Sequence, residues 1–219
     1  MRVFLGPRAC LKIADAVAEL GNFHELDWSA PFDFDAIRKA LPPDATCSGM
    51  YLERSLAAME EFGARAKVVA GAPEIRASYS MFRKYPYLEY VAVMEVSSRF
   101  VAEREGISIR ESLRRLGQSY YPMLANTLAG KVVFGVLGRD PERVFAIGNK
   151  GWEMALNFGN VRVQRLEDRH YLYQFVDTPT FVDTTSVGIL EGAAQFLGVD
   201  ARVRIDFVDA GNAVLELRW

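Results

Sequence analysis

The stretches NVRVQRLEDRHYLYQF (160–175) and RVRIDFVDAGNAVLELRW (202–219) decide the fold of this chain, because apolar and polar residues alternate along both. A period of two is typical of strands that bury one face. Short polar segments at 167–169 and 209–212 interrupt the alternation, and each predicts a turn between two strands. We therefore predict two antiparallel hairpins with one covered face.

Between the hairpins, residues 183–197 predict a helix that ends at Gly198. Upstream of residue 160 the periodicity is mostly helical. The predicted fold class is α+β: a mostly helical N-terminal two-thirds packed on a C-terminal antiparallel sheet, in the order strand, strand, helix, strand, strand.

Caps, prolines and glycines predict the helices upstream of the sheet. They are expected to begin at Pro7, at Asp33 or Asp35, near Gly49, at Pro86, at Ser108 and at Asp140, with a further helix that carries Trp152. Ser108 and Glu111 form a capping box, and Pro122 is expected to kink the helix that follows, because it supplies no backbone N–H. Residues 64–73 are expected to be a loop or a short extended piece, and residues 131–137 a buried apolar segment. Tyr85-Pro86 is expected to end a short helix.

No segment rich in Gly, Ser and Pro divides the 219 residues. We therefore expect an N-terminal helical lobe, residues 1–71, docked on a domain of helices and antiparallel sheet, residues 72–219, in one compact unit.

Charge and composition argue against several classes of function. The 26 Lys and Arg against 28 Asp and Glu leave no basic excess, so we expect no nucleic-acid partner. No apolar run is long enough to span a membrane. The two cysteines, Cys10 and Cys47, form neither a disulfide framework nor a zinc motif. The N-terminus lacks the apolar core of a signal peptide, and the expected location is the cytoplasm.

Catalytic signatures are missing from the sequence. It contains no phosphate-binding loop, no dinucleotide fingerprint, no Gly-x-Ser-x-Gly and no His-Glu-x-x-His. The two histidines are His24 and His170, and an enzyme using His170 with Asp168 and Tyr171 is one alternative. An ordinary exposed turn histidine is the favoured interpretation, and we predict that the chain is not an enzyme.

An aromatic cluster is the strongest candidate for a binding site, because aromatics make up 12% of the chain. It is expected to join helices that cover the sheet with residues of the sheet itself, and Phe181 lies at the sheet's exit. The candidate ligand-binding residues are Tyr120, Tyr121, Met123, Phe134, Trp152, Met154, Asn157, Phe158, Tyr173 and Phe175. They could line an apolar pocket with tyrosine hydroxyls and an amide as polar groups. The competing interpretation is a filled core.

Several segments resemble a large paralogous family of myxobacterial proteins of unknown function. The segments are SLRRLG (112–117), GKVVFGVLGRDP (130–141), NFG (157–159), VGILEG (187–192) and LELRW (215–219), together with ALPP (40–43), GMY (49–51) and YP (85–86). The likeness covers most of the chain. It implies no function, since none is established for that family.

The C-terminal part is more distantly similar to the superfamily that joins haem–nitric-oxide-binding domains, 4-vinyl-reductase domains and transport-complex subunits. The shared feature is a layer of helices over an antiparallel sheet, with a strand–helix–Gly–strand ending. The resemblance implies a haem, a small aromatic molecule or an acyl chain held inside the fold. The Tyr-x-Ser-x-Arg haem-propionate motif is absent, and no histidine lies on the helices expected to cover the sheet. The C-terminal half also lacks the cysteines that bind zinc in some 4-vinyl-reductase domains, so we predict neither a metal nor a cofactor.

Two hypotheses follow from these observations. The first is a cytoplasmic sensing or binding module that holds a small hydrophobic ligand in the aromatic pocket and forms a homodimer. The second is a structural or protein-interaction scaffold with a filled core, which an exposed apolar patch of Phe23, Trp28 and Phe32 would favour.

Overall fold

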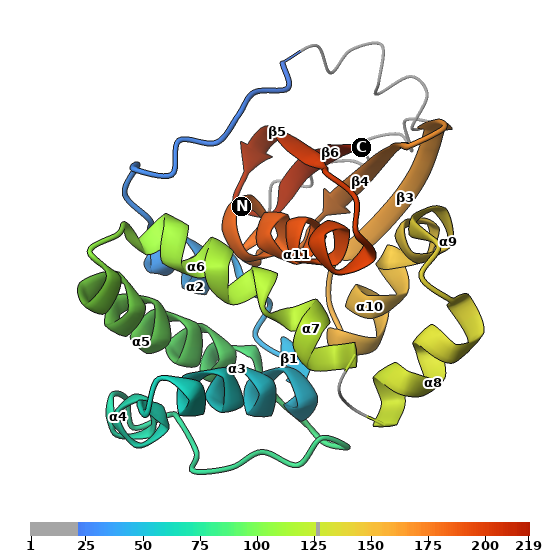
Figure 1. Ribbon diagram of the computed structural model, residues 1–219. Coiled ribbons are helices and arrows are strands. Elements are labelled where there is room, and N and C mark those ends of the chain that lie inside the picture. The colour runs from blue at the N-terminus through green and yellow to red at the C-terminus, as the bar shows by residue number, and fades with distance from the viewer. Residues whose placement is uncertain (1–21, 126–127) are drawn as a thin grey trace.

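The C-terminal sheet has the predicted strands and connections. A computed structural model describes residues 22–125 and 128–219 (Figure 1). The strands are β3 (Asn160–Glu167), β4 (His170–Val176), β5 (Arg202–Asp209) and β6 (Asn212–Arg218). They are antiparallel in the order β3-β4-β6-β5. Tyr173, for example, pairs with Leu215, so the two hairpins meet in the middle of one sheet. The predicted α+β class is confirmed.

The helix between the hairpins covers one face of this sheet (Figure 1). It begins with a π-helical turn, η1 (Val182–Ser186), and continues as α11 (Val187–Leu197). Gly198 ends it with a φ of 75°, a left-handed conformation that glycine adopts without steric cost.

Most of the remaining helices pack together beside the sheet and α11, whereas α9 (Pro141–Ala146) and α10 (Gly148–Ala155) pack against β3 (Figure 1). The bounds of the others are α2 (Phe34–Ala40), α3 (Gly49–Glu61), α4 (Arg65–Ala70), α5 (Tyr87–Glu105), α6 (Ile109–Gln118), α7 (Tyr120–Ala125) and α8 (Leu128–Leu137). The predicted caps Asp33 and Asp140 accept hydrogen bonds from the first turns of α2 and α9. Half of the predicted capping box forms: Ser108 Oγ accepts from Glu111 N at 3.0 Å, whereas Glu111 pairs with arginines instead.

Four local predictions need correction. Residues 65–70 form helix α4 rather than a loop. Tyr85-Pro86 belongs to a strand, β2 (Lys84–Pro86), which pairs with β1 (Thr46–Ser48). The apolar run 131–137 lies in α8, and Val136 is 77% exposed, because two residues along the helix turn it about 200° away from Phe134, which packs on Tyr121. The kink expected at Pro122 is a break between α6 and α7. The helix predicted from Pro7, and Cys10 with it, lies outside the described residues.

Glycines allow α6 and η1–α11 to cross with their backbones almost in contact. A Cβ atom placed on Gly188 would lie 2.0 Å from the carbonyl oxygen of Arg114, and one on Gly192 would lie 2.3 Å from that of Gln118. From the other side, a Cβ on Gly117 would lie 2.3 Å from the carbonyl oxygen of Thr185. Any side chain at these positions would therefore push the two layers apart.

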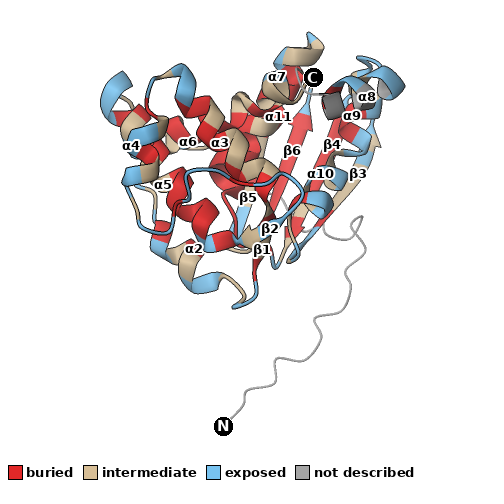
Figure 2. Cartoon of the chain, turned by 90° about the horizontal axis from the view of Figure 1, so that it is seen from below, coloured by how far each residue is buried: buried red, intermediate tan, exposed pale blue. Residues whose placement is uncertain are grey.

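Two hydrophobic clusters fill the molecule, as the buried residues in Figure 2 show. One lies among the helices and draws on α2, α3, α5 and α6, together with Phe181. The other lies between the sheet and α11 and includes Phe145 of α9. The helical cluster contains residues from both sides of position 71. The division into a lobe, residues 1–71, and a domain, residues 72–219, stays a prediction.

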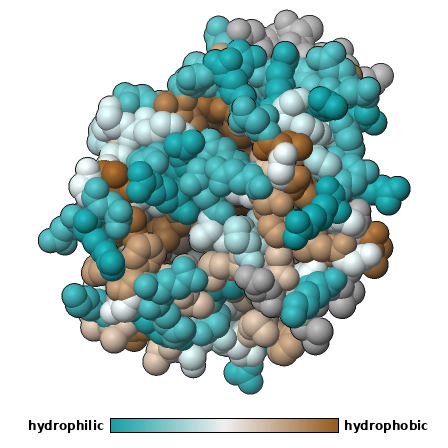
Figure 3. Space-filling model, viewed as in Figure 1, coloured by the Kyte–Doolittle hydropathy of each residue, from teal (hydrophilic) through white to brown (hydrophobic). Residues whose placement is uncertain are grey.

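The surface is mixed in character. Hydrophilic residues dominate the face in Figure 3, and hydrophobic residues appear between them as separate patches. Within the described ranges, no helix has the length and hydropathy needed to cross a bilayer.

Candidate functional site: a tyrosine-lined cavity

A cavity of about 130 Å³ lies where the helical layer meets η1 and α11. Its walls come from β1, α3, α5, α7 and α10, and from the chain that leaves the sheet at Thr180 and Phe181. Gly151 is exposed and Arg54 only partly buried, so these two residues mark its mouth. Segments that are distant in sequence therefore converge on one cavity that opens to the surface.

Tyrosine hydroxyls form the polar part of the wall. Tyr120 is central: its hydroxyl lies 2.7 Å from that of Tyr90 and 2.9 Å from Ser55 Oγ. At the mouth, the Tyr51 hydroxyl donates to the carbonyl oxygen of Gly151 at 3.1 Å. Burial raises the pKa of Tyr120 and takes that of Tyr90 well above its usual value. These groups are therefore neutral hydrogen-bond donors and acceptors.

Thr180 presents the one cavity-lining hydroxyl, among the described residues, that is buried without a hydrogen-bond partner. A buried hydroxyl that loses its bonds to water is destabilising unless a partner replaces them. Cys47 adds a buried thiol, and burial raises its pKa to about 12, which keeps the sulfur protonated. The wall thus carries one buried hydroxyl without a partner, and its Cys47 thiol is held in the neutral form.

Part of the predicted aromatic cluster reaches this cavity. Tyr120, Tyr121 and Trp152 line it. Phe175 lies behind Trp152, with ring centroids 5.3 Å apart in an edge-to-face arrangement. Tyr173 is fully buried, and its hydroxyl donates to the carbonyl oxygen of Phe145 at 2.7 Å. These two residues support the wall from the sheet.

The other predicted site residues lie elsewhere. Met154 is 72% exposed, because two residues along α10 turn it about 200° away from Trp152. Asn157 joins two loops: its side chain accepts from Thr46 N at 2.6 Å and donates to Asp44 O at 2.9 Å. Phe158 packs on the ring of Tyr87 in the helical cluster. Phe134 packs against Tyr121 and Phe196, and Met123 is a partly buried residue of α7 that does not line the cavity.

Sequence reasoning missed the half of the wall that comes from the N-terminal side. Cys47, Tyr51, Tyr87 and Tyr90 line this half, and Thr180, also missed, lines the cavity from the C-terminal side. The spacing of Tyr87 and Tyr90, three residues apart on the helix that Pro86 begins, puts both rings on one helical face. That spacing was the only available signal, and it indicates a buried face rather than a cavity.

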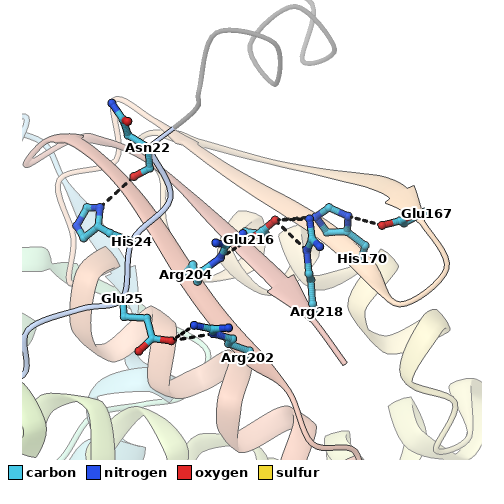
Figure 4. Close-up of polar contacts among 9 residues, drawn as sticks. All are labelled: Asn22, His24, Glu25, Glu167, His170, Arg202, Arg204, Glu216 and Arg218. Carbon is cyan, nitrogen blue, oxygen red and sulfur yellow. Dashed lines mark hydrogen bonds and ion pairs between the residues drawn. The ribbon is translucent and has the colours of Figure 1, made fainter.

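His170 does not form the enzyme-like group. Along β4 it points to the face of the sheet opposite Tyr171 and Tyr173, and its ring lies between Glu167 and Glu216 (Figure 4). Its Nε2 lies 3.0 Å from Glu216 Oε1 and its Nδ1 lies 3.2 Å from Glu167 Oε1. Asp168 is largely exposed and pairs with Arg165. The Tyr171 hydroxyl instead donates to Glu142 Oε2 at 2.7 Å. His170 is also buried, which corrects the expectation of an exposed turn histidine.

Glu216 organises the cluster around His170. Arg204 Nε donates to its Oε2 at 2.7 Å, and Arg218 Nε donates to its Oε1 at 3.0 Å. Burial alone would raise the pKa of Glu216, but the two guanidinium groups outweigh this effect and hold the pKa below its usual value. The cluster is an ion-paired network that stabilises the outer face of the sheet.

The antiparallel sheet and the helices around it have the fold of the H-NOX domains. An H-NOX protein from K. algicida with unliganded Fe(II) has a TM-score of 0.58 and 12% identity, over 78% of this chain and 95% of that chain. One from S. oneidensis in the Fe(II)NO ligation state has a TM-score of 0.60 and 17% identity, over 78% of this chain and 98% of that chain. At such identities the likeness shows the fold alone.

The chain belongs to the family described as protein of unknown function (DUF2378), whose model matches residues 41–219. No curated protein sequence matches the chain.

The residues around the cavity do not fit a haem. About 130 Å³ is below the roughly 300 Å³ at which pockets for drug-sized ligands begin. His24 pairs with Ile205 at the edge of the sheet, and His170 lies on the sheet's outer face, so neither reaches the cavity. The Cys47 thiol and the lining tyrosines are held in their neutral forms, whereas thiolate or phenolate would be needed to bind iron.

Proposed function

We propose that this protein is a non-enzymatic sensing or binding module that holds one small neutral aromatic molecule, bearing a hydroxyl group, in the tyrosine-lined cavity. The observation that carries the proposal is the buried, unpartnered hydroxyl of Thr180 on the cavity wall. A ligand hydroxyl that bonded to it would remove the desolvation cost of that group.

The size and lining of the cavity support a ligand of about one ring. An engineered apolar cavity of about 150 Å³ is known to accept benzene, and the cavity here is about 130 Å³. The rings of Tyr121, Trp152 and Phe181 lie around the space and offer faces and edges to an aromatic ligand. Structures of the similar H-NOX proteins are in the Fe(II)NO and Fe(II)CO ligation states, and the H-NOX family holds a haem. The volume and the residues of the cavity, which do not fit a haem, support a different ligand in the same fold.

Thr180→Val is expected to weaken binding of 4-methylphenol about fivefold to tenfold and to leave binding of toluene unchanged. The substitution keeps the shape of the side chain and removes only the hydroxyl, which is worth about 1 kcal/mol when it forms one neutral hydrogen bond. Isothermal titration calorimetry of both probes measures the difference.

Thr184→Val is the matched control, because Thr184 Oγ1 is also buried and unpartnered but does not line the cavity. It should leave the affinity for 4-methylphenol unchanged. Equal losses in both variants, or none in Thr180→Val, would refute the role given to Thr180.

Haem is not expected to bind stoichiometrically. Titration of the purified protein with hemin should give only the broad absorbance of free or surface-bound haem. A sharp Soret band saturating at one haem per chain, and shifting when CO is added to the reduced sample, would show that the cavity opens to accept a porphyrin.

The alternative hypothesis, a protein-interaction scaffold, would be favoured by an exposed apolar patch of Phe23, Trp28 and Phe32. Phe23 is only partly exposed, and Trp28 packs against the sheet cluster beneath Arg114. Phe32 stacks on Phe181, with ring centroids 5.8 Å apart. The three residues therefore form no exposed patch. A cytoplasmic location, a homodimer and membership of the myxobacterial paralogues stay predictions.

A further inference from the structure

A tight turn at residues 80–83 carries two large apolar side chains at its tip. Arg83 N donates to Ser80 O at 3.2 Å, which closes the turn and leaves Met81 and Phe82 at its two central positions. Phe82 is 95% exposed and Met81 is 51% exposed. Transfer of these apolar side chains out of water would be favourable, by roughly 25 cal/mol per Å² of apolar surface covered.

The turn is held rigidly in this position by its neighbours. Gly49 N donates to Arg83 O at 2.7 Å, and Ser80 N donates to the Tyr85 hydroxyl at 2.9 Å. A Cβ on Gly49 would lie 2.2 Å from Ser80 O, so the start of α3 packs directly against the turn. The two apolar side chains are therefore presented by a fixed backbone.

Two cations follow the apolar tip. Arg83 and Lys84 are both exposed, and neither forms an ion pair with any residue in 22–125 or 128–219. The carboxylates of the neighbouring segments have other partners: Glu89 binds Arg76 at 2.9 Å and Glu53 binds Arg65 at 2.7 Å. The turn therefore combines a projecting apolar tip with uncompensated positive charge.

We propose that this turn docks the protein on the surface of an anionic lipid bilayer. Met81 and Phe82 enter the boundary between headgroups and acyl chains, while Arg83 and Lys84 bind the anionic headgroups. A bilayer accepts a side chain that projects from a convex turn, whereas a stable protein interface needs a much larger complementary surface around it. One apolar tip and two cations give weak, reversible and salt-sensitive binding.

Co-sedimentation of the full chain with vesicles tests the proposal. Binding is expected to vesicles of phosphatidylcholine with phosphatidylglycerol at low salt, and to fall steeply with phosphatidylcholine alone or at high salt. Phe82→Ala should weaken binding about tenfold or more, as expected for loss of one inserted aromatic ring. Arg83→Gln with Lys84→Gln should weaken it about tenfold and remove most of the salt dependence.

Met154→Ala is the matched control, because Met154 is an exposed apolar residue on a different element, α10. It should bind the vesicles like the unaltered chain. The proposal fails if anionic vesicles do not bind at low salt, or if Phe82→Ala binds as well as the Met154 variant. A concentration-dependent dimer that Phe82→Ala dissociates, without vesicle binding, would instead assign the turn to a protein interface and overturn the proposal.

Discussion

Gly188→Ala is expected to lower the free energy of unfolding by about 3 kcal/mol or more. The added methyl group would lie 2.0 Å from the carbonyl oxygen of Arg114 and 2.9 Å from its carbonyl carbon, and backbone atoms cannot rotate away as a side chain would. Relief requires α6 and α11 to separate. Their separation would also strain the bidentate pair of Arg114 with Glu191, whose shorter contact is 2.6 Å. Chemical denaturation measures the loss.

Gly135→Ala provides the control for this result. Gly135 also lies within a helix, α8, but a Cβ there would meet no atom within 4 Å. The same substitution should therefore raise the stability by about 0.5–1 kcal/mol, through the better helix propensity of alanine. Similar effects in both variants would mean that the close crossing of α6 and α11 does not exist.

Glu216→Gln is expected to lower the free energy of unfolding by about 2–3 kcal/mol near neutral pH. The amide keeps the shape of the side chain but loses the charge that accepts hydrogen bonds from Arg204 and Arg218, and bonds to charged groups are worth about 1.5–3 kcal/mol. It also offers an N–H where His170 or an arginine now donates. Glu216 is almost fully buried, so water cannot readily replace the lost partner.

The pH dependence of this loss follows from the direction of the pKa shift. The pKa of Glu216 is lower in the folded protein than its usual value, which is about 4.3 in unfolded chains. Its charge therefore contributes stability that is fully present above this value and is lost as the pH falls through the lower folded pKa. The stability difference between the unaltered chain and Glu216→Gln should shrink in acid. A difference that stays constant from neutral pH down to pH values well below about 4 would contradict this account.

The sheet was predictable because its evidence is local. Each strand shows its buried face by alternation, as in Val203 and Ile205, and the two hairpin turns are short and polar. The strands β1 and β2 are three residues long, which is too short for a period to appear. Their central pair, Cys47 with Tyr85, is 38 residues apart in sequence, and α3 and the turn at 80–83 bring the two strands together. The run 131–137 is apolar enough to look buried, and only the tertiary packing shows that Val136 is exposed.

The cavity was predictable only in part, because segments that are distant in sequence form its walls. Composition and helical spacing indicate which aromatic residues are buried, and Tyr120, Tyr121 and Trp152 do line the cavity. A cavity is a gap between several segments, so its opposite wall, with Cys47 and Thr180, depends on how distant parts of the chain pack. No pattern within a single segment reports that packing.

The central claim is most directly tested by a crystal structure of the protein soaked with 4-methylphenol. We expect difference electron density for one ring inside the cavity beside Tyr120, with its hydroxyl oxygen at hydrogen-bond distance from Thr180 Oγ1. Density for ordered water alone at a saturating concentration of the probe, or a ring bound elsewhere on the protein, would contradict it.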